Sequence, residues 1–309
     1  MRNSILYGDC RETLKQFASY KDKARMCVTS PPYYGLRDYG GEDNQIGQEQ
    51  SPEDFIKNLV EVFGLVRDCL TDDGTLWVNI GDSYYNYRPG RGQSYPKQSV
   101  SKTKQDLPDK CNKRANKLEG LKEKDLIGIP WMLAFALRAD GWYLRQDIIW
   151  HKPNPMPESV RYRCTKSHEY IFLLSKNKRY YYDNEAIKEP AKDWGTRDRT
   201  NGKYHNKGTG LSPHTGLSKS YAKKNKRSVW RVTNKPYKGA HFAVYPPDLI
   251  EPCIKAGSQS GDIILDPFMG SGTTARVARS LNRDYIGCEL HEDYRDLIEI
   301  PSLDGLVEK

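Results

Sequence analysis

The sequence predicts an α/β domain built on a mainly parallel sheet. Segments with strand patterns alternate along the chain with segments whose apolar residues recur at helical spacing. Most of the expected strands are continuous apolar runs, which is typical of parallel strands covered on both faces. The 309 residues, of which 37% are hydrophobic, are sufficient for one large core. No run of about 18 apolar residues predicts a membrane span.

The first part of the chain alternates between short strands and amphipathic helices. A strand at residues 4–7 precedes a helix at 11–20, and a second strand at 24–29 stops abruptly at Pro31-Pro32 because proline has no N–H to donate. The helix expected from residue 52 to about 70 has Ser51 as its N-cap and a proline in its first turn. Asp73-Gly74 predicts a turn, and residues 75–80 predict a strand.

The remainder of the chain continues this alternation. The expected elements are a helix at 130–139, strands at 143–150 and 169–175, a hairpin partner for the latter at 179–182, a helix at 246–256, a strand at 262–265, a helix at 273–281, a strand at 285–287 and a short helix from 292 to about 298.

Positive charge is concentrated in two polar segments. Residues 84–124 hold 11 Lys/Arg and 4 Asp/Glu, a net charge of +7, and residues 184–240 hold 14 Lys/Arg and 4 Asp/Glu, a net charge of +10. The whole chain has a net charge of +9. The rest of the chain therefore carries −8. Such concentration indicates a phosphate-backbone partner, although solvated loops that repel each other would show the same pattern. Residues 84–124 are expected to be a flexible basic insert, either a nucleic-acid-facing flap bearing Tyr84, Tyr85, Tyr87 and Tyr95 or a disordered loop.

Cysteine and histidine usage argues against disulfides and metal sites. The seven cysteines include no Cys-x-x-Cys pair, and the six histidines show no ligand spacing. An odd, scattered set of cysteines is typical of a reducing cytoplasm. The first residues lead directly into an expected strand, so we expect no signal peptide and a cytoplasmic location.

A glycine-rich loop follows an expected strand near the C-terminus, in the sequence Asp266-Pro267-Phe268-Met269-Gly270-Ser271-Gly272-Thr273-Thr274. Glycines let the backbone approach a ligand closely, and the helix that follows offers free N–H groups. Glu289 lies 23 residues after Asp266, close to the spacing of about 20 at which an acidic residue meets ribose hydroxyls. NAD is disfavoured because Ala275 replaces the third glycine of Gly-x-Gly-x-x-Gly. A tight turn without a ligand is the alternative.

A second candidate loop, Thr29-Ser30-Pro31-Pro32-Tyr33, follows the strand expected at 24–29. Taken together, the two loops resemble the motifs of amino-methylating DNA methyltransferases, in the order of their permuted beta group. The resemblance covers most of the chain. It implies a Rossmann-like methyltransferase domain with permuted motif order and an inserted basic target-recognition lobe. It also implies S-adenosyl-L-methionine as the cofactor and double-stranded DNA as the partner.

The resemblance implies a role for each residue of the Ser-Pro-Pro-Tyr loop. An exocyclic amine is a poor nucleophile because its lone pair is delocalised into the ring, and in this family hydrogen-bond acceptors localise it. Here the acceptors would be the Ser30 hydroxyl and the Pro31 carbonyl, preorganised by the rigid Pro31-Pro32 pair. Tyr33 would stack on a base flipped out of the duplex.

The resemblance further implies cofactor contacts from the glycine loop, the first strand ends and a segment just before the glycine loop. These candidates are Asp9, Thr29, His241, Phe242, Asp266, Pro267, Phe268, Gly270, Ser271, Gly272, Thr273 and Glu289. Near the base pocket, Asn154 is expected to face the base, Arg161 and Arg163 to meet phosphates, and His168 and Glu169 to be mainly structural.

The motifs divide the chain into two regions. Residues 1–183 and 241–309 together form the expected catalytic domain, and residues 184–240 form the target-recognition region. The expected DNA contacts in that region are Arg197, Arg199, Lys223, Lys224, Lys226 and Arg227. Serine at the first position of the tetrapeptide favours cytosine N4 over adenine N6.

Several alternatives stay open at this point. Adenine N6 is the first alternative target. RNA or protein methylation and a non-catalytic DNA-binding role are the others. The sequence does not decide between a monomer and a homodimer, or whether a companion restriction endonuclease exists.

Overall fold

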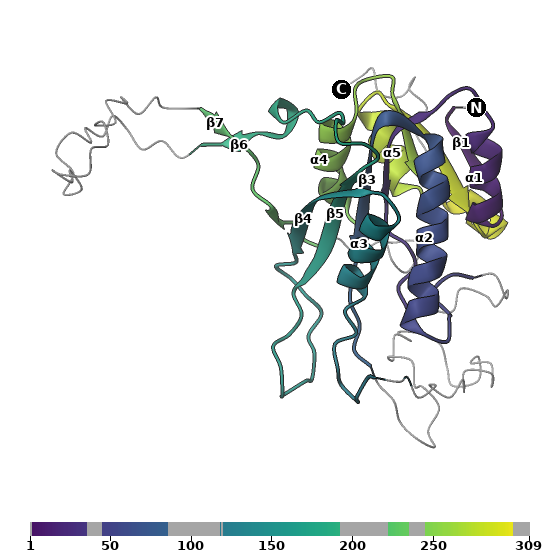
Figure 1. Ribbon diagram of the computed structural model, residues 1–309. Helices are drawn as coiled ribbons and strands as arrows, with labels where there is room; N and C mark the ends of the chain where they lie inside the picture. The colour runs from purple at the N-terminus through teal and green to yellow at the C-terminus, as the bar shows by residue number, and fades with distance from the viewer. Residues whose placement is uncertain are drawn as a thin grey trace, which may run out of the picture.

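The computed structural model describes residues 2–35, 45–85, 118, 120–191, 222–234 and 245–298. One eight-stranded sheet with helices on both faces forms the body of the molecule (Figure 1). The predicted α/β architecture with a mainly parallel sheet is therefore confirmed.

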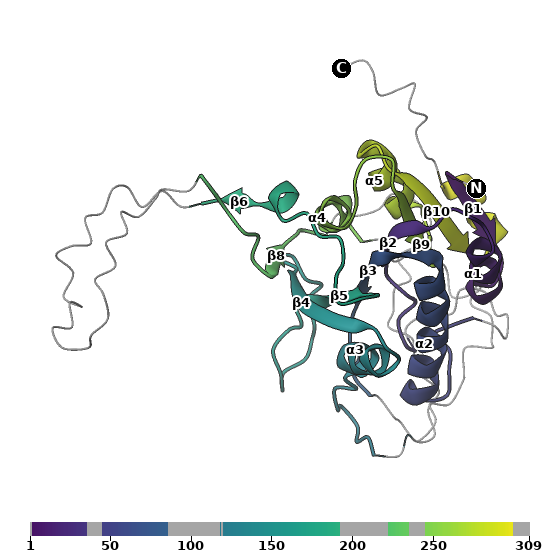
Figure 2. The ribbon, with the colours of Figure 1, turned by 45° about the horizontal axis from the view of Figure 1, so that its top comes forward.

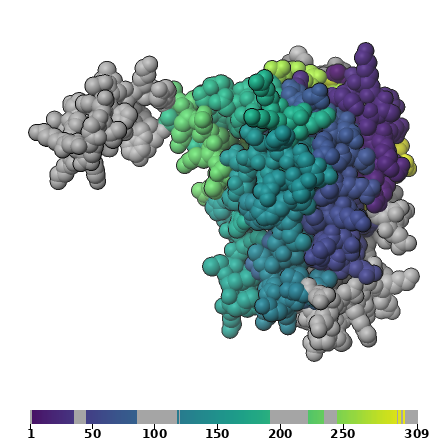
Figure 3. Space-filling view, viewed as in Figure 1, coloured from purple at the N-terminus to yellow at the C-terminus, as the bar shows by residue number. Residues whose placement is uncertain are grey.

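Strands from both ends of the chain lie side by side in this sheet. In spatial order the strands are β1 (Ser4–Tyr7), β10 (Asp284–Glu289), β9 (Ile263–Asp266), β2 (Ala24–Thr29), β3 (Leu70–Ile80), β5 (His168–Ser175), β4 (Tyr143–His151) and β8 (Val229–Arg231). The run from β1 to β3 is parallel, β5 is antiparallel to both of its neighbours, and β8 is parallel to β4. In the space-filling view the N-terminal residues, in purple, accordingly lie beside residues near the C-terminus, in yellow (Figure 3).

Helices cover the two faces of the sheet in separate groups. Helices α1 (Cys10–Ala18), α2 (Pro52–Cys69) and α3 (Ile129–Ala139) cover one face, and α4 (Pro247–Gly257) and α5 (Thr273–Ser280) cover the other (Figure 2). The remaining described elements are η1 (Glu185–Ile187), β6 (Glu189–Pro190), β7 (Lys223–Lys224) and η2 (Glu292–Leu297). Strands β6 and β7 pair with each other and lie away from the main sheet (Figures 1 and 2).

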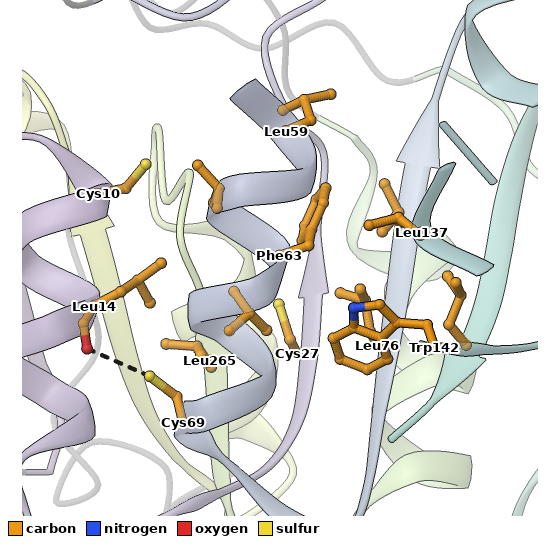
Figure 4. Close-up of a cluster of buried hydrophobic side chains, with 14 of the residues drawn as sticks. Cys10, Leu14, Cys27, Leu59, Phe63, Cys69, Leu76, Leu137, Trp142 and Leu265 are labelled. Atoms are coloured by element: carbon orange, nitrogen blue, oxygen red, sulfur yellow. Dashed lines mark hydrogen bonds between the residues drawn. The ribbon is translucent and has the colours of Figure 1, made fainter. Parts of the chain in front are cut away.

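Helix α2 shows how the sequence specifies one of these layers. The Ser51 hydroxyl accepts a hydrogen bond from the Asp54 N–H at 3.1 Å, and Pro52 occupies the first turn. The buried stripe of α2 then packs between α1 and the residues around α3, with Leu59 and Phe63 facing Leu137 and Trp142 (Figure 4). Burial of such large side chains stabilises the helix far more than its intrinsic propensity does.

Parallel strands bring the chemically interesting loops to one edge of the sheet. Strands β1, β2, β3, β9 and β10 all end at the same edge, and β4 ends there too. The loop between β4 and β5 extends from this edge, at the bottom of Figure 1. The two candidate loops follow β2 and β9, which are neighbours in the sheet.

Two sequence-based expectations about local structure are wrong. Asp73 and Gly74 form no turn between elements, because β3 begins at Leu70 and residues 71–74 bulge within the strand as its pairing with β2 shifts. Residues 179–182 are not a hairpin partner of β5: the Tyr181 N–H donates to the Asp73 carbonyl at 2.9 Å, and the Tyr182 ring stacks on Trp77. Side-chain packing on the core therefore overrides the predicted hairpin.

Several expectations concern residues outside the described ranges. These are the central part of the 84–124 insert, including Tyr87 and Tyr95, and the candidate contacts Arg197, Arg199, His241 and Phe242. At the edges of the insert, Tyr84 forms a β-bridge with Leu126, and Tyr85 is buried. Six cysteines lie in the described ranges and none is disulfide-bonded there; five of the six are buried. None of the described helices combines the length and the apolar character needed to cross a membrane.

Candidate active site

A buried hydrogen bond joins the two loops that the sequence analysis selected. Thr29 is the last residue of β2 and Asp266 is the last residue of β9. The Thr29 hydroxyl donates to the Asp266 carboxylate at 2.6 Å, and both side chains are almost completely buried. Residues separated by 237 positions in the sequence therefore hold the proline loop and the glycine loop together.

Asp266 accepts hydrogen bonds from three further groups. The Thr274 hydroxyl donates at 2.5 Å and the Tyr245 hydroxyl at 3.1 Å, while the backbone N–H of Phe268 donates at 3.0 Å. Burial raises the pKa of Asp266, and these hydrogen bonds act in the opposite direction. Asp266 therefore connects the end of the strand, the turn of the loop and the start of α5. Sequence reasoning selected Asp266 but missed Tyr245, whose position 21 residues upstream gives no local signal.

The glycine loop depends on backbone conformations that glycine adopts readily. Gly270 and Gly272 have φ angles of 53° and 78°. A Cβ atom at Gly272 would lie 2.6 Å from the Ile298 side chain, and one at Gly287 would lie 2.2 Å from Met269. Within the described part of the chain, no side chain caps the N-terminus of α5, which begins directly after Gly272. The loop thus presents tightly packed backbone and helix N–H groups at the sheet edge.

Glu289 lies at the end of the neighbouring strand β10 and contacts the same loop. Its carboxylate accepts a hydrogen bond from the Gly270 N–H at 2.8 Å and from the His291 N–H at 3.1 Å. Only 7% of the residue is exposed. Burial raises the pKa of Glu289 above its ordinary value of 4.5, and the two backbone hydrogen bonds offset part of that rise.

The raised pKa of Glu289 predicts a pH-dependent stability. The folded protein retains the proton on this carboxyl at pH values where the unfolded chain has lost it, so the contribution is present at low pH and is lost as pH rises through the folded pKa. We expect the free energy of unfolding of the wild type, minus that of Glu289→Gln, to fall as pH increases above about 4 and then to become constant. Denaturant unfolding of both proteins at a series of pH values would measure this difference in free energy. A difference that is flat, or that grows with pH, would contradict the assignment.

Asp9 stands after β1, at the same edge of the sheet. Its carboxylate accepts the Arg11 N–H at 2.8 Å as the N-cap of α1 and forms an ion pair with the Arg11 guanidinium at 2.6 Å. Partial burial raises the pKa of Asp9, but the hydrogen bonds from Arg11 outweigh this effect and hold the pKa below its ordinary value. Asp9 is therefore ionised and fixed in position.

The Ser30-Pro31-Pro32-Tyr33 segment lies directly after Thr29. Pro31 is buried, whereas Ser30, Pro32 and Tyr33 are partly exposed. The Tyr33 hydroxyl donates to the Glu169 carboxylate at 2.8 Å. Gly81, directly after β3, allows the Tyr33 ring to approach: a Cβ atom there would lie 2.7 Å from the ring. The loop is thus fixed at its start by Asp266 and at its end by Glu169.

The described part of the predicted recognition region contains basic side chains that form ion pairs with one glutamate. Lys224 and Arg227 both form ion pairs with Glu189, at 3.3 and 2.6 Å. Lys223 is exposed, and the Lys226 ammonium lies 5.0 Å from the centre of the Trp230 ring. No group of three or more potential metal ligands occurs among the described residues.

Comparisons with known proteins find similar sequences and similar folds. The family model for N6/N4 DNA methylases matches residues 24–299. The chain is 49% identical to the Type II methyltransferase M.SmaI of Serratia marcescens, over 95% of this chain and 88% of that protein. It is 46% identical to the Type II methyltransferase M.Cfr9I of Citrobacter freundii, over 95% and 85% of the respective chains.

Solved structures share the fold at lower sequence identity. The PvuII cytosine-N4-specific DNA methyltransferase superposes with a TM-score of 0.61 and 17% identity, over 96% of this chain and 85% of that chain. The crystal structure of the M1.HpyAVI–SAM complex gives a TM-score of 0.55 at 17% identity, over 96% and 97% of the respective chains.

Proposed function

The chain belongs to the family of N6/N4 DNA methylases, and from this membership we propose that it is a site-specific DNA methyltransferase. It transfers the methyl group of S-adenosyl-L-methionine to the exocyclic amine of a flipped-out base, with cytosine N4 as the acceptor. The relatives' shared name of Type II methyltransferase supports a role as the modification enzyme of a restriction–modification pair acting in the cytoplasm.

One observation carries this proposal: the buried hydrogen bond between Thr29 and Asp266 at 2.6 Å. It places the Ser-Pro-Pro-Tyr loop beside the glycine loop, as a reaction between a base and a cofactor requires. A glycine turn without a ligand, or a proline turn with a surface tyrosine, would not need this buried connection between distant segments.

The residues present fit the cofactor. Glu289 offers a buried carboxylate to the ribose hydroxyls, and its bond to the Gly270 N–H aligns it with the glycine loop. Asp9, held by Arg11, and the partly exposed Phe268 complete the set of candidate contacts on neighbouring strand ends. When bound, S-adenosyl-L-methionine supplies an electrophilic methyl group on a sulfonium.

The protein's own contribution to the reaction is to orient the amine. The Ser30 hydroxyl and the Pro31 carbonyl accept hydrogen bonds from the amine and direct its lone pair out of the ring plane. The Tyr33 ring stacks on the extruded base, which a duplex would otherwise keep inaccessible. The prolines and the Thr29–Asp266 bond hold these groups in place before the substrate arrives.

Nucleoside mass spectrometry tests the function and the target base together. The protein would be expressed in a host that lacks its own DNA methylation, with the same host carrying the empty vector as the control. N4-methylcytosine in the DNA of the expressing host alone would support the proposal. N6-methyladenine would retain the mechanism and overturn the base assignment. Neither product, from folded protein that binds the cofactor, would direct the search to RNA and then to the non-catalytic alternative.

A further inference from the structure

Glu169 is the centre of a polar cluster beside the proline loop. Its carboxylate accepts hydrogen bonds from the Tyr33 hydroxyl at 2.8 Å and from the Asn79 side-chain amide at 3.3 Å, and it forms an ion pair with Lys152. The Glu169 side chain is only 14% exposed, and that of Lys152 is 18% exposed. Each partner comes from a different strand or loop at the carboxyl edge of the sheet.

We propose that Glu169 is a positioning residue that holds the Tyr33 ring in the orientation needed to stack on the target base. This inference rests on the proposed function, because it assigns the ring the role of a stacking platform. It assigns Glu169 a role in the reaction, whereas the sequence suggested a mainly structural one.

The Tyr33 side chain is restrained at two points. Its hydroxyl is bound to Glu169. One edge of its ring packs so closely against Gly81 that a Cβ atom at that position would not fit. A tyrosine side chain has two principal torsions, so fixing the hydroxyl and one ring edge determines the plane of the ring. Stacking depends on that plane, because a tilted ring loses overlap with the base.

The carboxylate itself is also held by groups that lie outside the proline loop. Lys152 neutralises Glu169 and lies over the Trp150 ring, 4.2 Å from its centre. The Trp150 indole N–H donates to the Val232 carbonyl at 2.9 Å. Asn79 donates to the Tyr170 carbonyl at 3.1 Å as well as to Glu169. A partly buried carboxylate with three donors is costly to lose, since each donor would be left without this acceptor.

The experiment measures single-turnover transfer of labelled methyl groups by the full chain, held in excess over the sites in plasmid DNA from a host that lacks DNA methylation. The variants are Glu169→Gln, Tyr33→Phe and their combination. We expect each single variant to lower the rate about tenfold, with cofactor affinity within about twofold of the wild type. Tyr33→Phe removes the donor of this hydrogen bond, and Glu169→Gln replaces its charged acceptor by a neutral amide. Because both changes act on the same hydrogen bond, the double variant should lose no more than the worse single variant.

Two further variants keep the test decisive if Glu169→Gln folds poorly. Gly81→Ala displaces the Tyr33 ring but leaves the Glu169 carboxylate chemically intact, because its Cβ atom would lie 3.4 Å from Glu169 Cγ, an ordinary van der Waals distance. We expect this variant to lower the rate similarly. Glu251→Gln removes an exposed ion pair with Lys255 on α4 and serves as the control, with an unchanged rate. Thermal unfolding of every variant shows which are folded.

Three results would overturn the inference: an unchanged rate in Glu169→Gln, additive losses in the double variant, or an unchanged rate in Gly81→Ala. Failure of the proposed function is distinguishable, because the wild type itself would then transfer no methyl group to DNA.

Discussion

Replacing Asp266 by alanine is expected to abolish methyl transfer and to lower the free energy of unfolding by about 3 kcal/mol or more. The substitution removes the shared acceptor of four donors: the hydroxyls of Thr29, Thr274 and Tyr245, and the Phe268 N–H. Of these, the Tyr245 and Thr274 hydroxyls can still hydrogen-bond to each other. An unsatisfied buried donor costs about 1–3 kcal/mol, and the penalties here add only in part because the hydroxyls can rotate. The glycine loop and the proline loop lose their common anchor, so cofactor affinity should fall together with the rate.

Two further substitutions make this prediction specific. Asp266→Asn preserves the shape of the side chain but places an amide donor beside hydroxyls that also donate. We therefore expect intermediate losses of unfolding free energy and of cofactor affinity. Asp262→Ala removes a carboxylate just before the same strand, at the opposite edge of the sheet, where it accepts hydrogen bonds from Gln259 and Arg25. Denaturant unfolding and cofactor titration would compare the three. An Asp266→Ala protein that binds the cofactor as well as Asp262→Ala does would refute the anchoring role.

Replacing Ser30 by alanine should lower kcat by about a hundredfold or more, while the protein keeps its fold and its cofactor affinity. The Ser30 hydroxyl is proposed to contact only the target amine, and loss of one preorganised hydrogen-bonding group at a reacting centre typically costs 10²–10³-fold, or about 3–4 kcal/mol of activation free energy. Ser30 is partly exposed at the sheet edge, so its removal creates no buried cavity.

Ser30→Thr retains a hydroxyl at the same carbon and is expected to recover part of the lost rate. Ser19→Ala removes a hydroxyl at the exposed end of α1, where it donates to the Gln16 carbonyl, and provides the matched control. Steady-state kinetics with DNA, together with cofactor titration, separate the outcomes. Equal rates for Ser30→Ala and wild type would remove Ser30 from the mechanism, and a loss confined to KM would make it a binding residue.

The sequence predicted the strands and loops around the candidate site well because their signals are local. A strand followed by a glycine-rich loop, a rigid Pro-Pro turn, and an acidic residue 23 positions after another are all visible along the chain. Their common location follows from the rule that neighbouring parallel strands end at the same edge of the sheet. The bond between Thr29 and Asp266 then confirms that the two loops are adjacent.

What the sequence did not reveal are partnerships across long separations. Tyr245 joins Asp266, and Glu169 joins Tyr33 across 136 positions, without any periodic or spaced pattern to mark them. The strand order also escapes local reasoning. The turn predicted at Asp73-Gly74 is wrong for a related reason. This dipeptide is typical of turns, but here it lies in a bulge of β3. A Cβ atom at Gly74 would lie only 2.9 Å from the Leu70 side chain and the Thr71 carbonyl.

The order of strands in the sheet has a consequence for synthesis of the protein. Strands β10 and β9 lie between β1 and β2, so the first strand has no neighbour in the sheet until the ribosome has translated residue 289. Strand β2 also presents an open edge until residue 266 has been translated, and pairing across such separations is slow. A nascent or truncated chain that ends before residue 266 therefore has neither the Thr29–Asp266 bond nor the Glu289 carboxylate. The candidate site is therefore complete only after residue 289 has been translated.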